Sequence, residues 1–177
     1  MQTKLKNRQG FTIIEVMIVL AIAGLIMLIV FLAVPALQRS SRNTSRKNDA
    51  SRLATSVSSF VSNANGTLPC ESTGSVTAAP DDATTVLNDA GKLGQLTFSS
   101  SLCSTTASAT AGTFLITGAA PNPNAELTPT DNAVVVFLGA TCSGSYATPG
   151  STRQAALIYP IETTGSTPYT WSCISAL

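Results

Sequence analysis

The chain has 177 residues, a net charge of +1 and an apolar fraction of 44%, which suits one domain of ordinary size with an appendage. It contains no histidine, and its four cysteines form no Cys-x-x-Cys pair. This composition excludes Ser-His-Asp and Cys-His catalytic sets and His-ligated metals. We therefore expect no enzyme activity, no metal and no cofactor.

The charged residues are segregated along the chain. Residues 1–10 hold only basic charges, residues 39–52 hold five basic residues and a single acid, and residues 53–177 hold two basic residues against seven acids. The chain thus consists of a basic leader, a basic stem and an acidic head.

An uncharged apolar run over residues 16–37 follows the leader, and it is long enough for a helix that crosses a bilayer. Glu15 lies at its start, although a carboxylate in hydrocarbon costs about 2.5–3.5 kcal/mol. One interpretation is that Glu15 reaches the lipid headgroups. The other is that it pairs with a positive charge. Cleavage between Gly10 and Phe11 would create an α-amino group that a neighbouring subunit could present to it.

The stretch KNRQGFTIIEVMIVLAIAGLI resembles the prepilin signature of type IV pilins and their relatives. Gly10, Phe11, Thr12, Glu15 and Gly24 occupy the matching positions. The resemblance implies cleavage after Gly10 by prepilin peptidase and N-methylation of Phe11. It further implies that Glu15 and Thr12 take part in assembly of the helices into a filament core.

Two residues are expected to break this helix, Gly24 and Pro35. The usual helix-breaking proline of the family would fall near Leu32, so any kink is expected about one turn later, at Pro35. Beyond it the helix should continue over 36–62 and stop at Gly66. Six apolar residues recur at helical spacing in its last part: Ala50, Leu53, Ala54, Val57, Phe60 and Val61. They predict one face that the rest of the chain covers.

The basic run at 39–52 leaves three interpretations open. It could be a solvated helix face at the lipid headgroups, a belt that meets acidic heads of adjacent subunits, or a patch that contacts DNA. Nucleic acid is the least favoured partner, because no aromatic residues are interleaved with the charges.

The head reads as short strands separated by turns. We predict strands at 113–117, 133–138, 155–162 and 169–174, with a weaker candidate at 96–98. Turns and loops are predicted at 103–112, 121–124, 128–132, 143–152 and 163–168. The fold class is therefore α+β, with a long N-terminal helix packed on a small antiparallel sheet, an architecture that the resemblance also implies. The expected divisions are a leader (1–10), a membrane or filament-core helix (11–37), a stem helix (38–62) and a head (63–177).

Four well-separated cysteines beyond a membrane segment indicate two disulfides in an oxidising compartment. Three connectivities are possible. We expect Cys70–Cys103 and Cys142–Cys173, since pilin heads often carry such a pair near the C-terminus. The adjacent acids Asp81 and Asp82 are interpreted as solvated rather than as metal ligands.

The resemblance implies a structural subunit of a type IV pilus that serves adhesion, twitching motility or DNA uptake. Its partners would be copies of itself, prepilin peptidase, the pilus assembly machinery and, before assembly, the membrane. It would cross the cytoplasmic membrane once and then reach the cell surface. The alternatives are a pseudopilin of a type II secretion system and a membrane-anchored extracytoplasmic binding domain.

Overall fold

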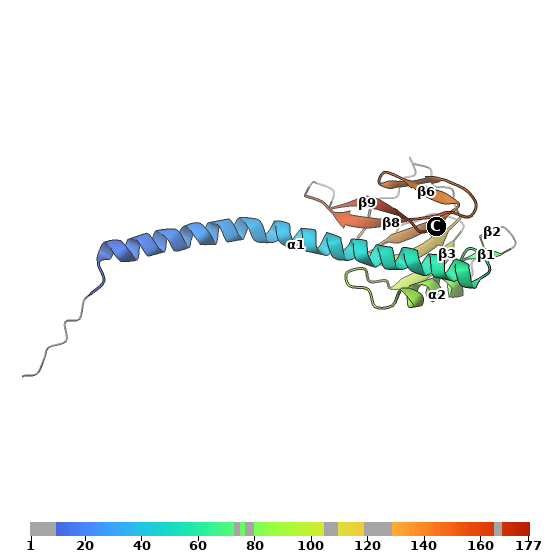
Figure 1. Ribbon diagram of the computed structural model, residues 1–177, viewed down its shortest axis with the longest axis horizontal. Coiled ribbons are helices and arrows are strands. Elements are labelled where there is room, and N and C mark those ends of the chain that lie inside the picture. Colours follow the sequence, from blue (N-terminus) through green and yellow to red (C-terminus); the bar gives the residue numbers. More distant parts are fainter. Residues whose placement is uncertain (1–9, 73–74, 77–79, 105–109, 119–128, 165–167) are drawn as a thin grey trace, which may run out of the picture. The chain divides into compact units, whose positions relative to one another are not determined.

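The computed structural model describes residues 10–72, 75–76, 80–104, 110–118, 129–164 and 168–177. The chain divides between Ser40 and Ser41 into two compact units, called here the N-terminal unit and the head unit. The elements are α1 (Ile13–Asn63), β1 (Glu71–Ser72), β2 (Ser75–Val76), α2 (Pro80–Ala90), β3 (Ser100–Ser104), β4 (Thr113–Thr117), β5 (Val134–Leu138), β6 (Ala140–Ser143), β7 (Tyr146–Pro149), β8 (Ala155–Glu162) and β9 (Tyr169–Ser175) (Figure 1).

Helix α1 is continuous through Gly24 and Pro35. The helix is thus not broken at either residue, and a kink at Pro35 stays a prediction. At its other end the helix closes with a left-handed turn, in which Gly66 has a φ of 87° and its N–H donates to the carbonyl of Val61 at 2.8 Å. Glycine adopts this backbone conformation without a steric penalty, which is why it ends the helix as the sequence predicts.

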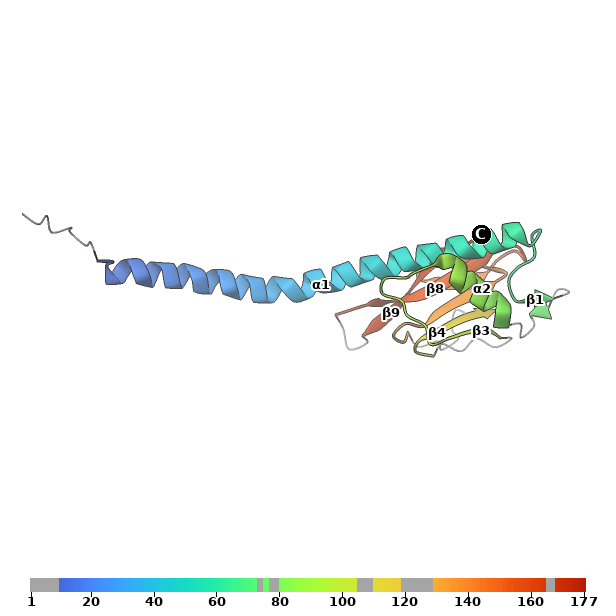
Figure 2. The same cartoon turned by 90° about the horizontal axis from the view of Figure 1, so that it is seen from below.

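The head unit contains a five-stranded sheet in the order β3-β4-β5-β8-β9 (Figure 2). The pairings β5–β8 and β8–β9 are antiparallel, whereas β3–β4 and β4–β5 are parallel. Two further antiparallel pairs, β1–β2 and β6–β7, lie outside this sheet. The α+β class is confirmed, and most strand pairs are antiparallel, but the main sheet itself is mixed.

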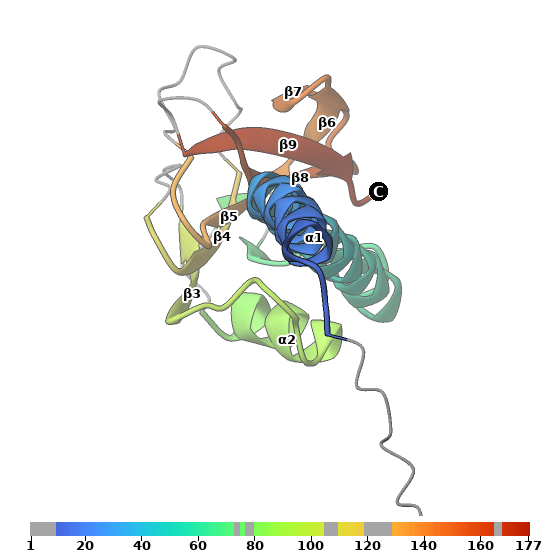
Figure 3. The same ribbon diagram turned by 90° about the vertical axis from the view of Figure 1, so that its left-hand side faces the viewer.

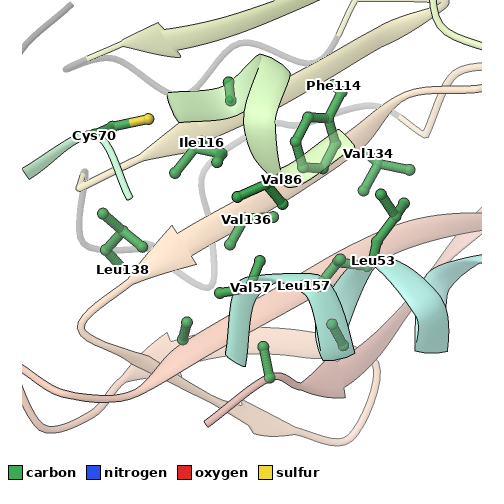
Figure 4. Close-up of a cluster of buried hydrophobic side chains, with 14 of the residues drawn as sticks. Leu53, Val57, Cys70, Val86, Phe114, Ile116, Val134, Val136, Leu138 and Leu157 are labelled. Atoms are coloured by element: carbon green, nitrogen blue, oxygen red, sulfur yellow. The ribbon is translucent and has the colours of Figure 1, made fainter. Parts of the chain in front are cut away.

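Both faces of the central strands are buried. On one face, α1 and α2 contribute Leu53, Val57 and Val86 to a cluster with Phe114 and other sheet residues (Figure 4). On the opposite face, the β6–β7 hairpin packs Ala140 and Ala147 against Trp171 and its neighbours. This two-sided burial explains why β4 and β5 are buried at every position and read as unbroken apolar runs rather than as alternating patterns.

Three sequence expectations differ from the structure. Residues 96–98 form no strand, and the edge strand β3 lies a few residues later; its Ser-rich sequence carries little strand signal. The predicted loop 143–152 contains β7, because a two-residue turn at Gly144 and Ser145 closes a hairpin there. Helix α2 was not expected at all. The predicted loop 121–124 lies outside the described residues, as do parts of those at 103–112, 128–132 and 163–168.

Candidate functional site

The N-terminal unit presents its apolar side chains to the surroundings on every side of the helix. Phe11 is 89% exposed and Ile13 is 82% exposed, and no large apolar residue from Val16 to Leu32 is buried. Helix α1 contains a window of mean hydropathy 3.2 with none of its residues buried, so it is long and apolar enough to cross a membrane. A helix that is apolar all round requires lipid or other protein to cover it.

Glu15 and Thr12 form a capping box at the start of α1. Glu15 Oε2 accepts hydrogen bonds from the Thr12 backbone N–H at 2.9 Å and from the Thr12 hydroxyl at 2.8 Å. The Glu15 N–H donates in return to the Thr12 hydroxyl at 3.4 Å. This arrangement satisfies N–H groups that have no partner within the helix. The Glu15 carboxylate therefore has a partner in its own chain, Thr12. Thr12 directly follows Phe11, which cleavage would make the N-terminal residue.

The bond that we expect prepilin peptidase to cut lies before the helix begins. Gly10 and Phe11 are both exposed and outside the helix, and no atom lies within 4 Å of the position that a Cβ on Gly10 would take. Exposed backbone outside regular secondary structure is the form in which a protease can take up a chain. Cleavage at this bond and methylation of Phe11 stay predictions.

The basic stem meets acids of its own head unit. Arg42 binds Glu162 in a two-pronged pair, with Nε at 2.8 Å from Oε1 and Nη2 at 2.7 Å from Oε2. The Asn43 side chain forms two hydrogen bonds with the backbone of Glu162. Its Nδ2 donates to the Glu162 carbonyl at 2.9 Å, and its Oδ1 accepts from the Glu162 N–H at 2.8 Å. The hydrogen bond to Glu162 raises the pKa of the Arg42 guanidinium above its ordinary value.

Arg46 lies one turn further along α1 and is buried. Its Nη2 is 2.8 Å from Asp131 Oδ1 and 3.5 Å from Glu162 Oε1, and its guanidinium carbon lies 5.1 Å from the centre of the Tyr169 ring. The ring and the two carboxylates together compensate for removing this cation from water.

These contacts give partners to two of the five basic residues of the run, Arg42 and Arg46. Acids of the same chain hold Arg46, which is buried, and Arg42, which is partly exposed. Lys47 and Arg52 are exposed, so the lipid and DNA interpretations stay predictions for the rest of the run. The acidic partners expected on adjacent subunits are here Glu162 and Asp131 of the own head. Part of the charge that is segregated along the sequence is therefore paired within the fold.

Asp49 is a structural residue that sequence reasoning missed. It is 4% exposed, and its carboxylate accepts three backbone N–H bonds, from Gly94 at 2.9 Å, Gln95 at 2.7 Å and Leu96 at 3.0 Å. It thereby holds the segment between α2 and β3 against α1. One signal could have revealed it: Asp49 is the only acid of the basic run and directly precedes Ala50, where the apolar face begins.

Two disulfides join Cys70 to Cys103 and Cys142 to Cys173, the same pairs that the resemblance led us to expect. The first links the chain after α1 to strand β3, and the second links β6 to β9. Asp82 has a separate role, because its Oδ2 accepts the Cys70 N–H at 2.8 Å. In the part of the chain that the structure describes, no three acids, cysteines or histidines gather as they would around a metal ion.

Comparison with known proteins gives one result, at the N-terminus. A family described as the prokaryotic N-terminal methylation motif matches residues 5–31, and proteins with this motif are structural rather than enzymatic. No curated protein and no solved structure matches the chain. The matched residues cover the leader end, the capping box and the exposed apolar part of α1. The chain thus carries the class III signal of type IV pilin-like proteins and pseudopilins.

Proposed function

We propose that the protein is a structural subunit of a type IV pilus filament, assembled after its leader is removed between Gly10 and Phe11. One observation carries the proposal: the methylation motif covers the first part of α1, where the large apolar side chains from Ile13 to Leu32 are all exposed. In the membrane, lipid covers this surface. In the filament, the equivalent helices of other copies replace lipid as its cover. Close packing between the helices favours this contact, and leaving the surface in water would cost about 25 cal/mol per Å².

Glu15 has two functions in this proposal. It caps its own helix through Thr12, and its charge attracts the α-amino group of a neighbouring subunit's Phe11. The interaction is strong because a charge pair between apolar helices is poorly screened. Prepilin peptidase and the assembly machinery are the partners that deliver the subunit to this state.

Substitutions at the capping box separate these functions. Glu15→Gln keeps a side-chain oxygen that can accept both Thr12 hydrogen bonds, yet it removes the charge. Thr12→Ala keeps the charge and removes the cap, which is worth roughly 1 kcal/mol. We expect Glu15→Gln to be cleaved normally but to form few or no filaments, and Thr12→Ala to retain filaments at reduced yield.

The direct test is mass spectrometry of the N-terminal peptide from filaments sheared off intact cells that express the full chain. A peptide that begins at Phe11, with or without a methyl group, supports the proposal. A peptide that begins at Phe11 but stays in the cell envelope instead indicates a secretion pseudopilin. Unprocessed Met1 in the membrane fraction indicates an anchored domain. Normal filaments from Glu15→Gln would refute the role of the charge.

A further inference from the structure

The head unit has two surface features that its internal packing leaves unused, a groove and a projecting aromatic ring. The groove has a volume of about 560 Å³ and lies between the outer side of α1 and the end of α2. Hydroxyl side chains of α1, including Thr55 and Ser59, form one wall, and Arg52 and Asp89 supply its two charges. The projecting ring is Tyr146, which is 55% exposed at the start of β7.

The hairpin that carries Tyr146 is anchored on both sides of it, although the side chain itself is exposed. It follows the two-residue turn of the β6–β7 hairpin, and Cys142 on the same hairpin is bonded to Cys173 of β9. The next residue, Ala147, is 4% exposed and packs on the sheet. The Tyr146 hydroxyl has no hydrogen-bond partner among the described residues. A tyrosine has only two side-chain torsions and therefore loses little conformational entropy on binding, which makes it an effective anchor at an interface.

The groove matches the chemistry of a tyrosine. A guanidinium attracts the face of an aromatic ring, and a carboxylate accepts a hydrogen bond from a phenol. The head unit already contains the first of these pairings, since Arg46 lies over the ring of Tyr169 at 5.1 Å. The Arg52 side chain is fixed at the groove by a hydrogen bond from its Nη1 to the carbonyl of Lys92 at 2.9 Å.

The ring and the groove lie in opposite layers of the head unit. The hairpin packs on one face of the sheet, and α1 and α2 pack on the other; Figure 3 shows β6 and β7 on one side of the sheet and α2 on the other. One copy therefore cannot fill its own groove with its own ring. A contact between different surfaces of two identical chains does not close on itself, and it propagates into a helical polymer.

We propose that Tyr146 of one copy inserts into the groove lined by Arg52, Thr55 and Asp89 of the next copy, so that heads contact each other in the polymer. This contact rests on the proposed function, because it requires the filament. It adds a specific head-to-head contact to the non-specific burial of the apolar helices.

The test is site-specific photo-crosslinking in cells that make the full chain. A benzophenone amino acid replaces Tyr146, and the control position is Thr152, which is also exposed. We expect crosslinked dimers and higher multimers from position 146 only, with the crosslinked peptide containing residues 51–63 or 89–90. Filaments that form with crosslinks elsewhere, or with none, would refute the contact and leave the proposed function intact. An absence of filaments from the unsubstituted protein would refute the proposed function itself.

Substitutions give a second measurement. Tyr146→Ala should lower filament yield about tenfold, the change that corresponds to ~1.4 kcal/mol, whereas Tyr146→Phe should retain most of it. Thr55→Trp fills the groove from the other side and should have the same effect as Tyr146→Ala. Tyr146 and Thr55 are both exposed, so folding should be unaffected. Unchanged Trp171 fluorescence checks this for the two Tyr146 variants, and an unchanged circular dichroism spectrum checks it for Thr55→Trp. Equal filament yields for Tyr146→Ala, Thr55→Trp and the unsubstituted protein would overturn the inference.

Discussion

Asp49→Ala should strongly destabilise the head unit. The carboxylate is 4% exposed and accepts three backbone N–H bonds of 2.7–3.0 Å. Hydrogen bonds to a charged group contribute about 1.5–3 kcal/mol each, and an orphaned buried donor costs about 1–3 kcal/mol. Leu96 is itself 2% exposed, so its N–H cannot turn to water, whereas Gly94 and Gln95 lie nearer the surface.

Counting the Leu96 bond in full and the other two at partial value gives a loss of about 3–5 kcal/mol, which also matches the loss seen when one partner of a buried charged contact is removed. A domain of this size has roughly 5–15 kcal/mol of stability in total. The substitution should therefore remove a large share of it and release the segment between α2 and β3. Asp49→Asn should be intermediate, because its amide nitrogen cannot accept these bonds.

The assay is urea unfolding of the full chain in detergent micelles, followed by the fluorescence of Trp171, the single tryptophan. Trp171 is buried on the far face of the sheet, so it reports loss of the fold rather than the local change. Two controls are matched. Asp89→Asn removes an exposed acid, and Gly94→Ala keeps the N–H while placing a Cβ 3.6 Å from Asp49 Oδ1, an ordinary contact. A loss below about 1 kcal/mol for Asp49→Ala would refute the reasoning.

Two further predictions concern a disulfide and an ion pair of the head unit. Replacing Cys142 and Cys173 together by alanine opens a loop with a sequence separation of 31, so it should cost about 3–4 kcal/mol by the chain-entropy relation; a Trp171 unfolding midpoint equal to that of the unsubstituted protein would contradict this. A double-mutant cycle on Arg42→Gln and Glu162→Gln should give a favourable coupling that is the same at pH 7 and pH 10. The pKa of Arg42 is raised, so its contribution persists below its ordinary pKa and is lost only as the pH rises through the raised value. A coupling that disappears between pH 7 and pH 10 would show that the pair does not act as described.

Local patterns in the sequence were sufficient to predict the N-terminal helix, its end and several strands. The apolar run, its basic flanks and Glu15 identify the N-terminal helix, because a membrane or a polymer core imposes its requirements on consecutive residues. The strands at 113–117 and 155–162 match β4 and β8 residue for residue, since short runs of apolar and β-branched residues bounded by turns have few other solutions. Gly66 ends α1 because left-handed backbone conformation is a local property.

The tertiary structure alone decided which segments meet. Strand order and the parallel pairing of β3, β4 and β5 depend on contacts between residues far apart in sequence, and no local pattern distinguishes a parallel from an antiparallel neighbour when both faces of a strand are buried. The partners of the basic residues in the stem could not be predicted from local patterns either. Arg42 and Arg46 read as a basic face until Glu162 and Asp131, 85 or more residues away, neutralise them. The sequence shows where the charged residues lie along the chain. Only the fold determines whether opposite charges of the same chain come close enough to pair with them.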